Sequence, residues 1–450
     1  MTPIGLVGFG KVGQAVAAQV LDLGHTVTVV DIDAELKMIL ESGAFTSYEP
    51  GVLPAITDGF NAGRLSIHTE VSALRNSTAV IVCIPLLVHD AKNGRGSIDY
   101  EPFNQCFQSI ATVVHDNMLV VLETTVPVGT CRNRLVPIFS ACNKVHERDY
   151  LLAFSPERVM SNTMREQLVS LPKIVAGLTD QALAAVLDLY RSFLPPDLVE
   201  PVSSIETAEM IKLTAMVARD VNIALINQLS LFCDANKLDI REVIKNTNTD
   251  RVSNVLSPGI GVGGHCTPVY PHFLISNFSE SKLEFRLAQE ARKINDAMPE
   301  YVVASVCREF SLQSALIMGL GFRPDVKEDA YSPAYSLRRL LTERGVEVFI
   351  HDPLYSEEEL TSKGFVAAGN VYGRKFDAIF LVTAHSQYAT LNFPRIASLG
   401  CKIFVDGRNA FDEAVLRTCG IAYRGIGTGC LSPAEVKSQP KVVCPDSKVS

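Results

Sequence analysis

Several features that would assign a chain to a class of protein are missing from these 450 residues. The eleven cysteines lie far apart without a C-x-x-C pair, and the nine histidines have no zinc-ligand spacing. These absences exclude a disulfide framework, favour a reducing compartment and give no reason to expect a metal site. The net charge is −8, so we expect neither nucleic acid nor an anionic membrane as a partner.

Long hydrophobic runs are also missing. The longest, Ala79 to Val88, is far shorter than the roughly 20 residues of a membrane-spanning helix, and we expect it to be a buried strand running into Pro85. The first residues already have a strand pattern, so no signal peptide is expected. With 47% hydrophobic and 20% charged residues, the chain has the composition of a soluble globular protein. We therefore expect a cytoplasmic protein of two or three domains.

The start of the chain has the pattern of a dinucleotide-binding unit. A short strand over residues 4–7 leads into Gly8-Phe9-Gly10-Lys11-Val12-Gly13, which opens a helix to about Leu23. A second strand, Thr26 to Val30, ends at Asp31. The glycines let the backbone approach a pyrophosphate at the helix N-terminus. Asp31 would accept hydrogen bonds from the ribose hydroxyls and repel a 2′-phosphate, which favours NAD over NADP as the cofactor.

Two stretches of alternating strands and helices flank one long helix. Before residue 200, apolar runs such as Leu119–Leu122 are typical of parallel strands covered on both faces. From Ser204 to about Asn236, apolar residues recur at helical spacing without proline or glycine. The strand–helix–strand pattern restarts near Ser314. We predict an α/β protein with two Rossmann-like doubly wound domains joined by a long central helix. The predicted divisions are 1–203, 204–300, 301–430 and a disordered tail, 431–450.

One cysteine lies in a glycine-rich stretch. Cys266 follows Gly261-Val262-Gly263-Gly264-His265 and precedes Thr267-Pro268. Glycines let a backbone pass close to a bound molecule, and a thiolate can hold a carbonyl carbon covalently. The alternative is an inert cysteine beside a glycine turn.

Taken in order, the motifs resemble those of the nucleotide-sugar 6-dehydrogenases, the UDP-glucose and UDP-N-acetylmannosamine dehydrogenase family. The resemblance runs from about Ile4 to Ala410 and is nearer to the UDP-N-acetylhexosamine branch. A UDP- or dTDP-glucose 6-dehydrogenase is the alternative, because Met160-Ser161-Asn162 departs from that branch. The motifs are the opening glycines, Glu-Thr-Thr-Val-Pro, Ser-Pro-Glu-Arg-Val, Ala-Glu-Met-Ile-Lys, Gly-Val-Gly-Gly-His-Cys, Gly-Leu-Gly-Phe-Arg-Pro-Asp, Ser-Pro-Ala and Asp-Gly-Arg-Asn.

The resemblance implies a four-electron oxidation of a nucleotide sugar to a uronic acid. Two NAD molecules would take two hydrides from C6. Cys266 would attack the carbonyl that the first hydride leaves, giving a thiohemiacetal that yields the second hydride. The resulting thioester would then be hydrolysed.

The same resemblance implies roles for individual residues. Lys212 would stabilise the oxyanion, Glu157 would be a general base, and Thr125 would hold water near the nicotinamide. The alternatives are a solvated helix lysine for Lys212 and a surface loop acid for Glu157. The apolar neighbours of Lys212 favour the functional interpretation. The expected cofactor site comprises the opening glycine motif, Asp31, Pro85 and Thr125. The expected substrate site comprises Glu157, Arg158, Lys212, Arg251, Val262, Gly263, Phe322, Arg323 and Arg408, with Arg251 reaching across a dimer interface.

Three positions depart from the family pattern. Met216 replaces an asparagine one turn after the lysine, Tyr270 replaces an aspartate four residues after the cysteine, and Ala330 replaces an arginine before Ser-Pro-Ala. The resemblance implies that these positions bear on the oxyanion site, thioester hydrolysis and cofactor binding. A catalytically impaired subunit that binds a sugar nucleotide is therefore the alternative of another class. We also expect a homodimer or larger homo-oligomer, formed through the central helix.

Overall fold

The computed structural model describes residues 2–92 and 95–429. The chain forms two compact units, one of residues 1–218 with 269–286, the other of residues 219–268 with those from 287 on. The predicted boundaries at residues 203 and 300 remain a prediction. The predicted tail, 431–450, lies outside the described residues.

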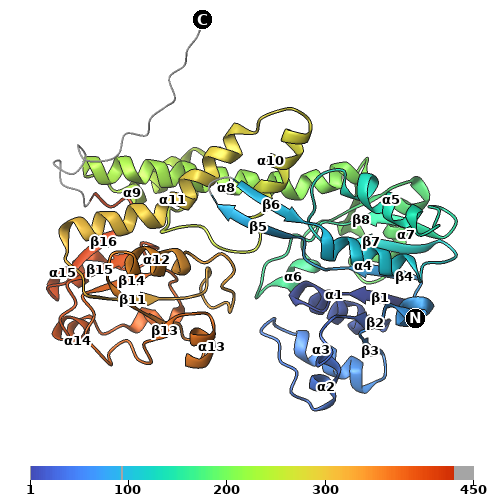
Figure 1. Ribbon diagram of the computed structural model, residues 1–450, viewed down its shortest axis with the longest axis horizontal. Helices are drawn as coiled ribbons and strands as arrows, with labels where there is room; N and C mark the ends of the chain where they lie inside the picture. Colours follow the sequence, from blue (N-terminus) through green and yellow to red (C-terminus); the bar gives the residue numbers. More distant parts are fainter. Residues whose placement is uncertain (1, 93–94, 430–450) are drawn as a thin grey trace, which may run out of the picture. The chain divides into compact units, whose positions relative to one another are not determined.

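The first unit is built on an eight-stranded sheet with the order β10-β9-β8-β7-β4-β1-β2-β3 (Figure 1). Six neighbouring strands, from β8 to β3, run parallel, whereas β9 pairs antiparallel with β8 and parallel with β10. The strands are β1 (Pro3–Val7), β2 (Thr26–Val30), β3 (Leu65–His68), β4 (Ala79–Val82), β7 (Met118–Leu122), β8 (Tyr150–Phe154), β9 (Lys173–Gly177) and β10 (Val199–Pro201). The helices are α1 (Lys11–Asp22), α2 (Leu36–Glu41), α3 (Val52–Asn61), α4 (Glu101–Ala111), α5 (Val136–Ala141), α6 (Met164–Leu168), α7 (Asp180–Arg191) and α10 (Tyr270–Glu280).

The run from Ala79 to Val88 is not the single strand that we expected. Strand β4 ends at Val82, and a separate antiparallel hairpin of β5 (Leu87–Lys92) and β6 (Arg95–Asp99) follows. Pro85 lies between them and has no N–H to give to a ladder, so the strand pattern is interrupted there.

The second unit contains a six-stranded parallel sheet with the order β13-β12-β11-β14-β15-β16. Alternate residues of β11 enter different apolar clusters, Ala315 and Ile317 on one face, Leu316 and Met318 on the other. Both faces are therefore buried, as in a doubly wound domain. The strands are β11 (Ser314–Met318), β12 (Glu347–His351), β13 (Val366–Ala367), β14 (Ala378–Leu381), β15 (Ile403–Asp406) and β16 (Ala422–Gly425). The helices are α9 (Ile240–Thr247), α11 (Arg286–Glu309), α12 (Pro333–Thr342), α13 (Glu357–Ser362), α14 (Phe393–Ser398) and α15 (Glu413–Thr418).

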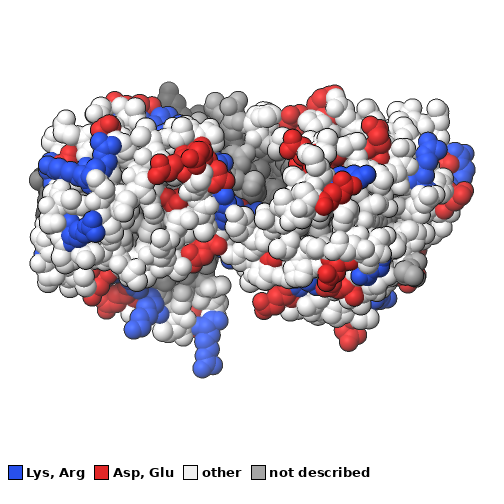
Figure 2. Space-filling view, turned by 90° about the horizontal axis from the view of Figure 1, so that it is seen from below, with Lys and Arg blue, Asp and Glu red and all other residues white. Residues whose placement is uncertain are grey.

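The predicted central helix is α8 (Ile205–Asn236), and its 32 residues contribute to both units. The prediction of an α/β protein with two such domains and a long linking helix is confirmed. No helix among the described residues combines the length and the apolar character needed to cross a membrane. Acidic and basic side chains are interspersed on the face that Figure 2 shows.

Candidate active site

The opening glycine motif connects β1 to α1, and glycine has a different structural role at each of its three positions. Gly8 has φ 91°, a conformation that favours glycine. A methyl group at Gly13 would lie 2.1 Å from the Gly8 carbonyl oxygen, so the helix could not pack against the turn. A methyl group at Gly10 would meet nothing within 4 Å, and α1 has no side-chain cap. An open backbone at an uncapped helix N-terminus fits a pyrophosphate.

Asp31 is held beside this turn. Its Oδ2 accepts the Phe9 N–H at 2.6 Å, and its Oδ1 accepts the Asp33 N–H at 2.9 Å. Each carboxylate oxygen keeps a further lone pair for an incoming hydroxyl. The residues present therefore fit a dinucleotide with a free 2′-hydroxyl.

Replacing Asp31 by alanine is expected to weaken NADH binding by about 10–100-fold, because charge-assisted hydrogen bonds to the ribose are lost. NADPH binding should weaken much less, because the substitution also removes the carboxylate that repels the 2′-phosphate of NADPH. Calorimetric titration of both nucleotides measures the ratio. Asp33→Asn is the matched control, because it removes one exposed charge from the same loop. An unchanged NADH-to-NADPH ratio in Asp31→Ala would contradict this role.

A buried cluster of charges lies beyond the carboxyl ends of β7 and β8. Lys173 Nζ is 2.9 Å from Glu123 Oε1 and 2.8 Å from Glu157 Oε2. Tyr190 donates its hydroxyl hydrogen to Glu123 Oε1. All four residues belong to the first unit, and Glu123 and Lys173 are almost fully buried. We call this group the Glu123–Lys173–Glu157 cluster.

Glu157 is more firmly held than a free catalytic base would be. Besides Lys173, its carboxylate accepts the N–H groups of Arg158 at 2.6 Å and Val159 at 2.9 Å. Burial alone would raise the pKa of Glu157, but Lys173 and the two backbone donors outweigh it and lower that pKa. Burial raises the pKa of Glu123. The Glu157 carboxylate is thus suited to accept a hydrogen bond and is a weak base.

The loop that carries Thr125 is clamped by the central helix. Thr125 is buried just after β7, and Glu209 of α8 accepts the Gly129 and Cys131 N–H groups, the latter at 2.9 Å. Burial raises the pKa of Glu209 to about 7 despite these donors. Lys212 lies one turn further along α8 and is 6% exposed, so it is not a solvated helix lysine. These contacts bring Thr125 and Lys212 onto adjoining elements of the first unit.

The loop with Cys266 belongs to the second unit. The Gly264 N–H donates to the Ala330 carbonyl oxygen at 2.7 Å, and a Cβ at Gly263 would lie 2.5 Å from Phe322 Cβ. Close packing within the protein therefore requires these glycines. From the sequence we expected a different reason for them, the close approach of the backbone to a bound molecule. Cys266 itself is half-buried.

The predicted arginines differ in their surroundings. Arg408 donates through Nε to the Val382 carbonyl at 2.7 Å and through a terminal nitrogen to the Phe322 carbonyl at 3.0 Å. Burial lowers its pKa. Arg323 is half-buried, whereas Arg251 is exposed with φ 67°. Arg408 thus braces the turn that holds Phe322 and is partly occupied by the protein itself.

The predicted site residues divide between the units. The glycine motif, Asp31, Pro85, Thr125, Glu157, Arg158 and Lys212 lie in the first, and Arg251, Val262, Gly263, Cys266, Phe322, Arg323 and Arg408 lie in the second. Pro85 is exposed, and Arg158 donates to the Pro172 carbonyl.

The three departing residues occupy ordinary structural positions. Met216 is buried in α8. Tyr270 begins α10, and its ring lies 5.5 Å from that of Phe273. Ala330 offers its carbonyl to the Cys266 loop. None of them supplies the amide, carboxylate or guanidinium that the family pattern has there.

Sequence reasoning did not single out Lys173, Glu123 or Tyr190. A lysine that opens the apolar run of β9 was the available signal for Lys173, because such a lysine is buried only with a partner. Glu123 lies within a quoted motif, but its burial depends on the fold.

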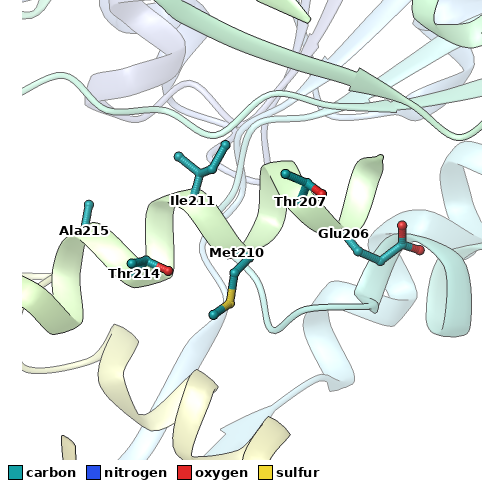
Figure 3. Close-up of a pocket in the computed structure, with 6 residues that line it drawn as sticks. All are labelled: Glu206, Thr207, Met210, Ile211, Thr214 and Ala215. Atoms are coloured by element: carbon teal, nitrogen blue, oxygen red, sulfur yellow. The ribbon is translucent and has the colours of Figure 1, made fainter. Parts of the chain in front are cut away.

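A hollow on α8 lies outside the predicted residues (Figure 3). Ile211 and Met210 point to different sides of the helix there. No predicted site residue lines the hollow, although Lys212 belongs to the same helix. Its lining residues are Glu206, Thr207, Met210, Ile211, Thr214 and Ala215.

Comparisons with known proteins agree with the motifs. Residues 2–194, 206–297 and 316–413 match the NAD binding, central and UDP binding domains of the UDP-glucose/GDP-mannose dehydrogenase family. UDP-N-acetyl-D-mannosamine dehydrogenase of Pyrococcus horikoshii is 29% identical over 436 residues, covering 95% of this chain and 99% of the relative. The Yersinia pestis enzyme of the same name is 30% identical, covering 86% and 94%.

Solved structures give the same result. The UDP-D-ManNAc dehydrogenase of Pyrococcus horikoshii has a TM-score of 0.84 at 27% identity, covering 96% of this chain and 100% of the other. The UDP-N-acetyl-mannosamine dehydrogenase Cap5O of Staphylococcus aureus has a TM-score of 0.80 at 26% identity, covering 95% and 98%. The chain belongs to the UDP-glucose/GDP-mannose dehydrogenase family and is an NAD-binding oxidoreductase.

Proposed function

We propose that this protein oxidises C6 of a UDP-N-acetylhexosamine, of the UDP-N-acetylmannosamine type, to the carboxylate. The observation that carries the proposal is Cys266, a half-buried thiol in a loop fixed to the protein by the backbone of Gly264. The choice of substrate is supported by relatives named UDP-N-acetyl-D-mannosamine dehydrogenases that match nearly the whole chain.

The bound dinucleotide would accept a hydride in each of two steps, so one sugar CH2OH, two NAD and one water give a carboxylate, two NADH and three protons. Cys266 forms a C–S bond to the carbonyl carbon, and water breaks that bond at the thioester stage. The Lys212 ammonium stabilises the oxyanion, and Thr125 positions water. With its pKa lowered, Glu157 orients water by accepting a hydrogen bond.

A panel of UDP-, dTDP- and GDP-hexoses with NAD tests the proposal. The expected result is two NADH per UDP-N-acetylmannosamine, together with an acidic product detected by mass spectrometry. A preference for UDP-glucose or dTDP-glucose would instead support the alternative, a UDP- or dTDP-glucose 6-dehydrogenase. Absence of NADH with every donor would reject an oxidoreductase acting on these sugars.

A second candidate is a sugar-nucleotide-binding subunit with impaired catalysis. Met216, Tyr270 and Ala330 favour it, because each lacks the polar group of the family pattern. It predicts saturable donor binding in calorimetry without NAD reduction. Measured turnover decides against it.

We further propose a homodimer formed through α8. Leu225, Leu229 and Phe232 recur along one side of the helix and are 51%, 42% and 59% exposed. Phe232→Glu should shift the protein from dimer to monomer in light scattering, because a charge cannot be buried there without a partner. Val415→Glu on α15 replaces an apolar side chain that is 48% exposed and should leave the mass unchanged. A monomeric unmodified protein would contradict the dimer.

A further inference from the structure

Two asparagines of α8 contact the stretch of chain that leads to Cys266. Asn222 Oδ1 accepts the Leu256 N–H at 2.9 Å, and its Nδ2 donates to the Asn254 carbonyl at 2.6 Å. Five residues later, Asn227 Oδ1 accepts the Gly259 N–H at 3.0 Å. All these residues belong to the second unit. The central helix thus ties down the approach to the nucleophile at two points.

Asn227 is itself fixed by a buried chain of hydrogen bonds between two helices that Figure 1 labels, α8 and α11. Its Nδ2 donates to Asn295 Oδ1 at 2.9 Å. Asn295 Nδ2 in turn donates to Asp220 Oδ1 at 2.7 Å and to the Asp220 carbonyl at 3.0 Å. Arg292 completes the chain with a bond of 2.6 Å to Asp220 Oδ1. Each of these four side chains is at most 1% exposed.

The Arg292–Asp220 ion pair at one end of the chain determines which way the side-chain amides of Asn295 and Asn227 point. The pKa of Asp220 is raised by burial only to about 6, so at neutral pH its carboxylate is ionised and can only accept. Asn295 must therefore turn its Nδ2 toward Asp220 and its Oδ1 toward Asn227. Asn227 then donates to Asn295, which leaves its own Oδ1 facing the Gly259 N–H. A flip of either amide would oppose two like groups in a dry interior.

Beyond Gly259, the hydrogen bonds that the structure describes for the segment up to Gly264 join backbone groups. The Ile260 N–H donates to the Gly407 carbonyl at 3.2 Å, and the Gly264 N–H donates to the Ala330 carbonyl at 2.7 Å. Glycine-rich backbone is conformationally permissive, so the orientation of the thiol depends on these anchors together with the packing of the buried Ile260. Asn227 supplies the side-chain anchor nearest to this glycine-rich stretch, and the buried chain determines the orientation of its amide.

We propose that Asn227 is a positioning residue for Cys266, oriented by the Arg292–Asp220–Asn295 chain. It holds the Gly259 amide and thereby fixes the start of the nucleophile loop. The inference rests on the proposed function, because it assigns the loop a catalytic thiol.

Hydrogen exchange of the full chain, read by mass spectrometry across 254–268, tests the anchor without requiring activity. In the unmodified protein the Gly259 amide should exchange at least about a hundredfold more slowly than an exposed amide. Asn227→Leu keeps the branched shape of the side chain and removes the acceptor, so exchange at Gly259 should quicken about 10–100-fold. Gln228→Ala, the exposed neighbour on α8, is the matched control and should change nothing. Rapid exchange at Gly259 in the unmodified protein would overturn the proposal even if the variant fails to fold.

Steady-state kinetics then separate positioning from mere structure. Asn227→Leu should lower kcat by about 10–100-fold while the KM values for NAD and sugar stay within about twofold, because neither ligand loses a contact. Faster exchange with an unchanged kcat would show a structural anchor only and would overturn the positioning role. Full turnover of Cys266→Ser would instead reject the proposed function and leave the exchange result standing.

Discussion

Cys266→Ser is expected to lower the rate of acid formation by about a thousandfold or more. A serine hydroxyl is a weak nucleophile without an adjacent base, so the carbonyl carbon would not be held for the second hydride transfer. The first hydride transfer needs no covalent bond to sulfur, and a small amount of NADH is therefore still expected. The measurement is NADH per sugar, with intact-protein mass spectrometry to follow the sugar adduct that the unmodified enzyme forms on Cys266.

Cys307→Ser provides the control, since this half-buried thiol lies on α11 of the same unit and has no assigned role. It should keep full turnover. If Cys266→Ser also kept full turnover, the reaction would be a two-electron oxidation that does not use the thiol. An adduct on Cys266 that persists in single turnover would indicate slow hydrolysis, in keeping with Tyr270 at the position of an expected aspartate.

Much of the fold was predictable because local patterns coincide with tertiary burial. β2 spans Thr26 to Val30 as expected, and α8 begins within one residue of the predicted start. Both have strong signals, an apolar run between turns and a long stretch without glycine or proline. The sequence did not predict the hairpin after β4. The apolar run continues through Pro85, so the residue composition does not change where β4 ends. The antiparallel pairing of β9 was likewise invisible, since strand direction is set by connections.

The site was less predictable, because its decisive contacts join residues far apart in the chain. Lys173 forms an ion pair with Glu123, which is 50 positions earlier in the chain. Asn227 is hydrogen-bonded to Asn295, which is 68 positions later. No role was assigned to Asn227 from the sequence. In the structure Asn227 accepts the Gly259 N–H, and its orientation depends on the packing of α11 against α8. The glycines before Cys266 were recognised, but their packing against Phe322 was not.

Lys173→Met is expected to have the largest effect on stability, lowering the free energy of unfolding of the first unit by about 3–5 kcal/mol. The substitution keeps the aliphatic stem and removes the charge that Glu123 and Glu157 share at 2.9 and 2.8 Å. Two carboxylates would then lie in one buried site without a cation. Calorimetric unfolding measures the loss. Lys37→Met is the matched control, because its pair with Glu41 lies in the first unit, is exposed and should contribute at most about 1 kcal/mol.

The dependence of this loss on pH identifies its origin. In the unmodified protein the pKa of Glu157 is lowered, so its contribution to stability is present above the unfolded pKa and is lost as pH falls. Without Lys173, the pKa of Glu123, already raised by burial, should rise further. A carboxyl with a raised pKa stabilises the folded state below its unfolded pKa and loses that contribution as pH rises. The deficit of Lys173→Met should therefore be larger at pH 8 than at pH 5, and adding Glu123→Gln should recover part of it by removing one buried charge. An equal deficit at both pH values, or no recovery in the double variant, would mean that lost packing and not uncompensated charge destabilises the protein.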